Sequence, residues 1–265
     1  MSQVEVSQGT LPVVLGMPHT GTQVPPEVQA VLNETGRALS DTDWHIHDLF
    51  AGLLPGASTV RATFHRYLID ANRDPSGASL YPGQNTTGLC PVTDFDGTPL
   101  YREGHEPDEA EIARRRAAHH APYHDALEAE LARLQAIHGQ VLLFDCHSIR
   151  SVIPHLFDGT LPDLNIGTDM GRTCDPTLEQ IAVTDCAKSE FSHVLNGRFR
   201  GGWTTRHYGD PARGRHAIQL EIAQSTYMEE VPPWRWRDDR ADRLRPVLVT
   251  LLDRLATATA QMEPL

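Results

Sequence analysis

The chain has 265 residues, of which 40% are hydrophobic, and a formal net charge of −12. This composition fits a soluble globular protein with one substantial core, and the acidic balance argues against nucleic acid or an anionic membrane as a partner. The first apolar run, at residues 13–15, is too short for a signal peptide or a membrane span, so we expect a cytoplasmic protein. The four cysteines form no C-x-x-C pair and are expected to be reduced thiols, and nothing in the sequence indicates an oligomeric state.

The first third of the chain predicts short strands around one helix. Residues 13–17 form an apolar run that we interpret as a buried strand. Residues 41–54 have apolar side chains at helical spacing. Residues 58–64 alternate polar and apolar side chains, which predicts a half-buried strand, and residues 67–71 predict another short strand.

The middle of the chain combines an irregular segment with a long helix. Residues 74–106 are rich in Gly, Pro, Asn and Thr, and irregular segments of this length are usually functional. A helix is predicted over residues 107–138, and Pro122 should kink or split it because proline lacks a backbone donor. His120 and His124, one helical turn apart, are expected on a solvated face.

The second half continues the alternation of strands and helices. Strands are predicted at residues 141–144 and 216–222, and helices at residues 176–189 and 234–262. This alternation predicts an α/β fold, which we interpret as one three-layer α/β/α domain over the whole chain with a mostly parallel, mixed central sheet.

Three of the predicted strands end in chemically active side chains. His19 follows the first strand, Asp145, Cys146 and His147 follow a later one, and Glu221 ends the last. Parallel sheets place functional sites at the carboxyl ends of their strands. The sequence therefore predicts one shared site for these residues.

Two histidines and a carboxylate are the usual ligands of a catalytic zinc, which keeps one position open for water. His19 and His147 are therefore candidate ligands, although each alone is more commonly a hydrogen-bonding turn residue. Asp145 could orient an imidazole through its carboxylate, and the alternative is that it is a cap or turn residue. Glu221 follows an apolar stretch, so it is either a general base with a raised pKa or a buried ion-pair partner.

Arginines provide candidate sites for an anionic ligand in spite of the acidic net charge. Arg66 and the pair Asn72-Arg73 flank a predicted strand, and arginine suits bidentate recognition of carboxylates. The alternative is a structural salt bridge. The glycine-rich stretch at residues 196–209 carries three more: Arg198, Arg200 and Arg206.

Seven stretches that span residues 19–228 resemble the N-formylglutamate amidohydrolase family and occur in the family's order. The family is similar in fold to the zinc carboxypeptidases and to aspartoacylase and succinylglutamate desuccinylase, which agrees with the predicted fold class. The stretches are MPHTGTQVP, DTDWHIHDLF, RYLIDANRDP, LYPGQNTTGLCP, FDCHSIRSVIPHLFDGTLPDLNIGT, NGRFRGGWTTRHYGDP and HAIQLEIAQSTYM.

The resemblance implies that His19 and His147 bind one divalent metal, Zn²⁺. The related enzymes take their acidic ligand from an H-x-x-E motif, whereas here His19 is followed by Thr-Gly-Thr. The third ligand must then come from elsewhere, and Asp43 is the first choice, with Asp41 and Asp48 as alternatives.

The resemblance also implies roles for the other candidates. Glu221 corresponds to the general base, and Arg66 to an arginine that stabilises the oxyanion. Asn72 and Arg73 match an Asn-Arg pair that binds substrate carboxylate, and we expect Arg206 to assist it.

The implied reaction is hydrolysis of N-formyl-L-glutamate to formate and L-glutamate in histidine degradation, by a zinc-dependent hydrolase of a linear amide. The partner is then a small anionic N-acyl amino acid. The alternatives are a deacylase of another N-acyl acidic amino acid, a hydrolase with Cys146 as nucleophile, and a non-enzymatic module that binds acidic amino acids. We expect no catalytic role for Cys146 or Ser148, because no separate base is apparent beside them.

Overall fold

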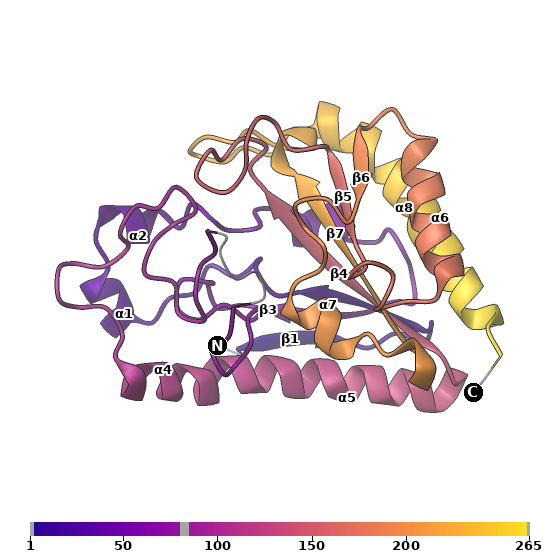
Figure 1. Ribbon diagram of the computed structural model, residues 1–265, viewed down its shortest axis with the longest axis horizontal. Coiled ribbons are helices and arrows are strands. Elements are labelled where there is room, and N and C mark those ends of the chain that lie inside the picture. The colour runs from indigo at the N-terminus through magenta and orange to yellow at the C-terminus, as the bar shows by residue number, and fades with distance from the viewer. Residues whose placement is uncertain (1–2, 80–84, 264–265) are drawn as a thin grey trace.

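A computed structural model describes residues 3–79 and 85–263 of the chain. Its centre is a seven-stranded sheet with the strand order β1-β3-β2-β4-β7-β5-β6 (Figure 1). Pairing is parallel from β3 through β2 and β4 to β7, and between β5 and β6. It is antiparallel between β1 and β3 and between β5 and β7, so the mostly parallel, mixed sheet is confirmed. The strands are β1 Val4–Ser7, β2 Val13–Met17, β3 Ser58–Ala62, β4 Val141–Ile149, β5 Leu164–Gly167, β6 His193–Leu195 and β7 Arg215–Ala223.

Helices cover both faces of this sheet and complete the three layers of the predicted α/β fold (Figure 1). Helices α4 and α5 run along one face, and α6 and α8 lie on the other. The four shorter helices lie in connections between strands. The helices are α1 Pro26–Val31, α2 Glu34–Ala38, α3 Ile46–Phe50, α4 Glu109–Arg115, α5 Ala121–His138, α6 Pro176–Ala187, α7 Trp203–Tyr208 and α8 Asp238–Gln261.

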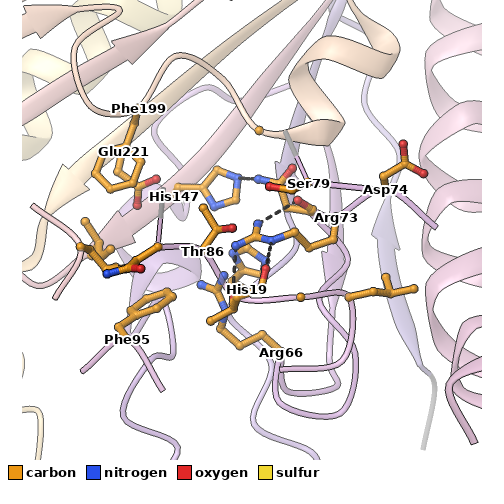
Figure 2. A pocket seen from close by; sticks show the side chains of 18 of the residues that line it. His19, Arg66, Arg73, Asp74, Ser79, Thr86, Phe95, His147, Phe199 and Glu221 are labelled. Atoms are coloured by element: carbon orange, nitrogen blue, oxygen red, sulfur yellow. Dashed lines mark hydrogen bonds between the residues drawn. The ribbon is translucent and has the colours of Figure 1, made fainter. Parts of the chain in front are cut away.

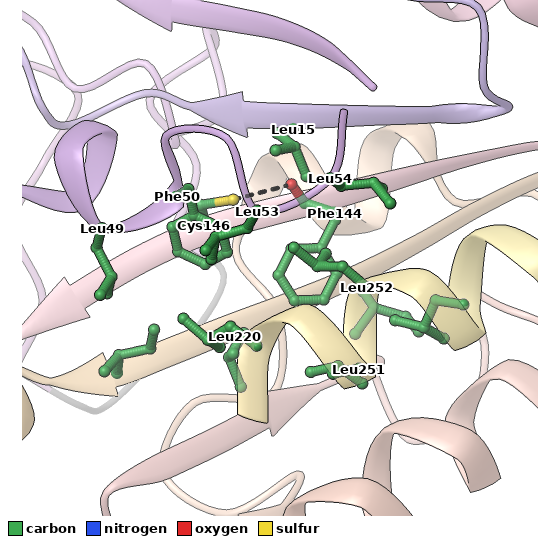
Figure 3. Packing of buried hydrophobic residues seen from close by; sticks show 14 of the residues in the cluster. Leu15, Leu49, Phe50, Leu53, Leu54, Phe144, Cys146, Leu220, Leu251 and Leu252 are labelled. Carbon is green, nitrogen blue, oxygen red and sulfur yellow. Dashed lines mark hydrogen bonds between the residues drawn. The ribbon is translucent and has the colours of Figure 1, made fainter. Parts of the chain in front are cut away.

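The alternation of side chains along β4 divides the core into two layers. Phe144 and Cys146 point into the cluster formed with α3, α6 and α8 (Figure 3). Leu143 points the opposite way, into the cluster that includes the buried face of α5. Because the side-chain period of a strand is two, Asp145 and His147 share the face of Leu143. They therefore lie on the α5 side of the sheet, near the carboxyl end of the strand.

Three expected elements differ from the structure. The helix expected at residues 41–54 is reduced to α3, because Asp43 and the residues around it form a turn that packs against the end of β2. The strand expected at residues 67–71 is a series of turns, because its backbone bonds to loops rather than to a neighbouring strand. For example, the Asp70 N–H donates to Leu89 O. The helix expected from residue 234 begins at α8, four residues later.

Strand β4 extends five residues beyond the predicted strand. It pairs with β7 along its full length, up to Ile149 opposite Ala223. Asp145, His147 and Ser148 are therefore strand residues rather than residues of the loop that follows. Strands β1, β5 and β6 were not expected from the sequence, because they contain only three or four residues and show no clear alternation.

Pro122 divides the long helix as predicted, through a π-helical turn at Arg116–His120. The Ala121 N–H donates to Arg116 O across this turn, and α5 then begins with Pro122 in its first turn. The expected solvated face is wrong, since His120 and His124 are both buried.

The described parts of residues 74–106 contain turns and isolated bridges, such as Thr93 with Pro99, but no helix or strand. Within the described residues, no helix has the length and apolar character needed to cross a membrane.

Candidate active site

A cavity of about 240 Å³ opens at the carboxyl ends of β2, β4 and β7. In the close view of this cavity, His147 lies between Glu221 on one side and Arg73 on the other (Figure 2). Phe95 and Phe199 contribute apolar surface to the wall. The predicted site residues that line the cavity are His19, Arg66, Asn72, Arg73, His147 and Glu221.

His19, Asp43 and His147 bring three potential ligand atoms within 4.8 Å of one another, and all three residues are buried. The Asp43 Oδ2 atom lies 3.2 Å from His147 Nδ1 and 3.8 Å from His19 Nδ1. His19 Nδ1 and Asp43 Oδ1 are buried without a hydrogen-bond partner among the described residues. Two imidazoles and one carboxylate with such unpartnered atoms fit a divalent cation that keeps an open position.

Three separate elements bring these residues together. His19 lies two residues beyond β2, and His147 lies within β4, which pairs with β2. Asp43 lies in the turn before α3, where its N–H donates to His19 O at 3.1 Å. Its Oδ2 accepts a hydrogen bond from the Ser148 N–H at 3.1 Å, which fixes the carboxylate toward the two imidazoles.

Asp70 holds the outer side of His19 and is a site residue that the sequence reasoning missed. His19 Nε2 donates to Asp70 Oδ1 at 2.7 Å, and Arg66 Nη2 donates to Asp70 Oδ2 at 2.7 Å. The Asn72 N–H also donates to Asp70 Oδ1. A carboxylate on the far nitrogen of a ligand imidazole fixes its tautomer and orientation. The sequence signal was an acid directly after an apolar run and two residues before the Asn-Arg pair.

His147 is held in a comparable way from its Nε2 side. Asp145 Oδ1 and Asn72 Nδ2 each lie 3.1 Å from His147 Nε2. The Asp145 carboxylate accepts a hydrogen bond from Thr205 Oγ1 at 2.9 Å, and Asn72 Oδ1 accepts one from the Thr204 N–H at 2.9 Å. Asp145 therefore has the position expected of a carboxylate that orients an imidazole.

The two imidazoles differ in protonation. Burial, together with the Arg66 guanidinium, lowers the pKa of His19, so this ring is neutral near pH 7. Although burial opposes the effect, Asp145 and Asp43 raise the pKa of His147 well above its usual value. An imidazole must be neutral to bind a metal, so a cation held at this position would have to displace any proton from the metal-facing nitrogen of His147.

Glu221 faces the same cavity from the neighbouring strand. It lies directly opposite His147 in the β4–β7 pairing and lines the cavity, although its side chain is almost fully buried. Burial raises the pKa of Glu221 to about 7. A carboxylate with a pKa near neutrality is suited to accept and return a proton during catalysis.

Arg66 keeps its charge at the buried end of the site. Although burial opposes the effect, Asp70 and Asp43 raise its pKa further above the ordinary value. Arg66 Nη1 lies 3.7 Å from Asp43 Oδ1, and its guanidinium carbon lies 4.6 Å from the centre of the Phe95 ring. The structure therefore fixes the positively charged Arg66 guanidinium beside the three potential metal ligands.

The arginines considered for binding a substrate carboxylate differ in their position relative to the cavity. Arg73 and Arg198 line the cavity. Arg73 donates to Thr87 O and Oγ1, both at 2.9 Å, and Arg198 donates to Leu156 O at 3.0 Å. Arg206 is not among the described residues that line the cavity, because its guanidinium bonds Gly201 O and lies 3.4 Å from Asp169. The geometry therefore favours Arg198 over the expected Arg206.

The other candidates lie away from the centre. Cys146 faces the apolar core between β4 and α8 (Figure 3), where burial raises the pKa of its thiol well above the usual value. This placement argues against a nucleophilic Cys146. Asp41 accepts a hydrogen bond from the Phe95 N–H, and the Asp48 side chain is 58% exposed beside His47. Among the three aspartates considered as the acidic ligand, the structure places Asp43 with the histidines.

Replacing Asp43 with asparagine should show by experiment which of these aspartates is the acidic metal ligand. We expect Asp43→Asn to weaken zinc binding by at least the roughly 10–100-fold that loss of an orienting partner costs, because it removes a charged ligand. Competition with a chromophoric chelator measures the affinity. Asp48→Asn is the matched control and should bind zinc like the parent protein. Equal affinities in the two variants would exclude Asp43 as a ligand.

Comparison with known proteins places this geometry in context. The family profile described as N-formylglutamate amidohydrolase matches residues 11–228. The chain is 52% identical over 251 residues to a Pseudomonas aeruginosa protein named N-formylglutamate deformylase, with 94% of each chain covered. It is 51% identical to a Pseudomonas putida protein of the same name, covering 94% of this chain and 93% of the relative.

Solved structures agree with these sequence matches. The crystal structure of N-formylglutamate amidohydrolase from Ralstonia eutropha is similar to this chain with a TM-score of 0.81 and 26% identity, and 98% of each chain is covered. An Agrobacterium tumefaciens gene product is similar in fold, with a TM-score of 0.75 and 19% identity over 97% of this chain and 96% of that one.

Proposed function

The chain belongs to the N-formylglutamate amidohydrolase family, and we propose on that basis that it hydrolyses N-formyl-L-glutamate to formate and L-glutamate. One observation carries the proposal beyond family membership. Two members of the cluster of His19, Asp43 and His147, the histidines, line the same cavity as Glu221, a buried carboxylate whose pKa burial raises to about 7. This combination of ligands and base suits metal-assisted hydrolysis of an amide. The family resemblance further supports a place for the reaction in histidine degradation.

We propose that one divalent cation is held by His19, Asp43 and His147. Two imidazoles and a carboxylate in a buried cluster favour Zn²⁺ among common biological cations. When bound, such a cation supplies a Lewis acid that polarises the formyl carbonyl and makes water more acidic. Asp70 and Asp145 hold the outer nitrogens of the two histidines in the arrangement that this role requires.

The chain itself then supplies the proton transfers and the charge stabilisation. Glu221 takes a proton from the attacking water as the new C–O bond forms, and gives it to the glutamate nitrogen as the C–N bond breaks. Arg66, fixed by Asp70, has its guanidinium 3.7 Å from Asp43 Oδ1 and stabilises the negative charge that develops on the formyl oxygen.

The substrate carries two carboxylates, and arginines at the cavity match them. Arg73 and Arg198 enter from different segments of the chain, and both line the cavity. We propose that these two guanidinium groups, with Asn72 between Arg73 and His147, bind the substrate carboxylates. They create a local positive site in a protein whose net charge is −12.

Replacing Arg198 with alanine should impair carboxylate recognition selectively. We expect kcat/KM for N-formylglutamate to fall roughly 30-fold or more. This corresponds to a loss of about 2 kcal/mol of transition-state stabilisation, since an anionic group of the substrate loses its partner in a desolvated site. The value for N-formylmethionine, which lacks the second carboxylate, should change much less. The ratio of the two kcat/KM values is the measurement.

Arg206→Ala is the matched control, because Arg206 belongs to the same glycine-rich stretch but bonds Gly201 and Asp169. It should change kcat/KM by less than about threefold, as expected for a residue away from the site. An unchanged substrate ratio in Arg198→Ala, or a larger change in Arg206→Ala, would refute carboxylate recognition by Arg198.

Release of L-glutamate, the product common to a panel of N-acylated glutamates, tests the proposed function as a whole. The panel contains N-formyl, N-acetyl and N-succinyl glutamate, each assayed with and without a chelator. We expect rapid, chelator-sensitive release of glutamate from N-formylglutamate, with formate as the second product, and slower release of glutamate from the compounds with larger acyl groups. Preference for the acetyl or succinyl compound would identify a different deacylase, and no hydrolysis of any compound would favour a binding module.

A further inference from the structure

The segment at residues 71–73 carries two cavity residues but has no regular secondary structure. Side chains from the long helix therefore hold its backbone. Ala71 O accepts a hydrogen bond from His124 Nε2 at 2.8 Å, and Arg73 O accepts one from His120 Nε2 at 3.0 Å. The carbonyls on either side of Asn72 are thus fixed by two histidines that the proposed mechanism does not use.

The break in the helix places both rings on this segment. His120 is the last residue of the π-helical turn and His124 lies in the first turns of α5, with ring centroids 4.4 Å apart. Within the π turn, His119 and His120 are both buried, although they are adjacent. Isolated π turns within helices occur frequently at functional sites.

The protonation of the two rings agrees with this arrangement. Burial lowers the pKa of His120, and it lowers the pKa of His124 to about 3, so both imidazoles are neutral near pH 7. A neutral imidazole has one N–H, and a carbonyl oxygen only accepts, so this N–H must be on Nε2 in each ring. His124 Nδ1 is then free to accept from Tyr208 Oη at 2.9 Å.

Helix α7 completes the support from the other side. Trp203 packs against both histidines, with ring centroids 4.7 Å from His124 and 5.7 Å from His120. The next residue, Thr204, donates its N–H to Asn72 Oδ1 at 2.9 Å. Asn72 is therefore held through its neighbouring carbonyls by α5 and through its own side chain by α7.

We propose that His120 and His124 are positioning residues that fix residues 71–73 and thereby set the placement of Asn72 and Arg73 at the cavity. Neither histidine belongs to the ligand cluster or to the described residues that line the cavity. Their effect on catalysis rests on the proposed deformylase function, whereas their effect on the backbone of residues 71–73 does not.

The experiment compares His120→Leu and His124→Leu with His120→Gln, which retains a donor near the Nε2 position, and with His119→Leu. His119 is an equally buried neighbour, but its Nδ1 lies 2.6 Å from Gln3 Oε1 and not near residues 71–73. Amide hydrogen exchange of the peptide that contains residues 71–73 is measured together with kcat/KM for N-formylglutamate, zinc content and Tm.

We expect faster exchange in both leucine variants at positions 120 and 124, and kcat/KM lower by about 10–100-fold, the scale of a small misplacement of a substrate-binding group. Zinc content should stay at the parent level, and His120→Gln and His119→Leu should keep parent exchange at residues 71–73 and kcat/KM within about threefold. His119→Leu should nevertheless have a lower Tm than the parent protein. A lower Tm without faster exchange or lower kcat/KM distinguishes the positioning role from general destabilisation.

Two results would overturn the proposal. The first is that His120→Leu and His124→Leu have the same exchange rates at residues 71–73 and the same kcat/KM as His119→Leu. The other is a His120→Gln variant as impaired as His120→Leu, which would mean that the hydrogen bond is not the relevant contact. If His124→Leu does not fold, the His120 and His119 variants decide alone. If the parent releases no formate, the proposed function fails, and the exchange data still test the positioning role.

Discussion

Replacing His19 or His147 with alanine should remove the bound cation and nearly all activity. Each histidine offers one of three potential ligand atoms that lie within 4.8 Å of one another, so its loss would leave two ligands for the proposed cation. Lewis-acid catalysis contributes several kcal/mol, and we therefore expect kcat/KM for N-formylglutamate to fall by roughly 10³-fold or more. Elemental analysis of the purified variants measures the metal, and formate release measures the rate.

His216→Ala is the control for the loss of a buried histidine. His216 lies at the start of β7, away from the cavity, and its Nε2 bonds Gln140. This variant should keep its metal and its activity even if its Tm falls. Full activity with about one zinc per chain in His19→Ala or His147→Ala would exclude the proposed metal site.

Replacing Glu221 with glutamine should separate catalysis from metal binding. The amide has the shape of the carboxylate but does not accept a proton, so we expect metal content and fold to persist. The rate should fall by roughly 10²–10⁴-fold, the usual contribution of general acid–base catalysis. A matched variant is Glu130→Gln, which alters a buried carboxylate that bonds Ser58 and Arg133 on the α5 side of the sheet. A loss below about threefold in Glu221→Gln would instead identify Glu221 as a structural anion.

The pH profile gives a second measure of the same role. A base acts in its ionised form, so kcat/KM rises with pH through the pKa of Glu221 and is lost below it. Burial raises this pKa to about 7, and a nearby cation lowers it again, so the acidic limb should lie at or below about pH 7. The Glu221→Gln variant should lose this limb, because amides do not titrate in this range.

The sequence was sufficient to predict that the central candidate residues lie together, because their placement depends on strand order. His19, His147 and Glu221 each follow or end an apolar run, and parallel strands bring such positions to one edge of the sheet. The alternation of strands and helices was sufficient to predict the mixed α/β fold for the same reason. Alternation along β4 and β7 then decides which side chains face the cavity and which, like Cys146, face the core.

The loop residues of the site were harder to predict, because their positions depend on contacts distant in sequence. Asp43 is selected from three nearby aspartates by its hydrogen bonds to His19 and Ser148. Asp70 lies in turns that resemble a strand in the sequence, and it becomes important through His19, which is 51 residues away. Arg198 and Arg206 belong to one glycine-rich stretch, but Arg198 precedes α7 whereas Arg206 lies within it, and this difference places only Arg198 at the cavity.

The most direct test of the account is a metal titration of the purified protein. Chelated protein is reloaded with increasing amounts of zinc, and formate release from N-formylglutamate is measured at each level of bound metal. The account predicts negligible release from metal-free protein and a rate that rises in proportion to bound zinc, up to about one ion per chain, as expected for one three-ligand site. Undiminished formate release from metal-free protein would contradict it.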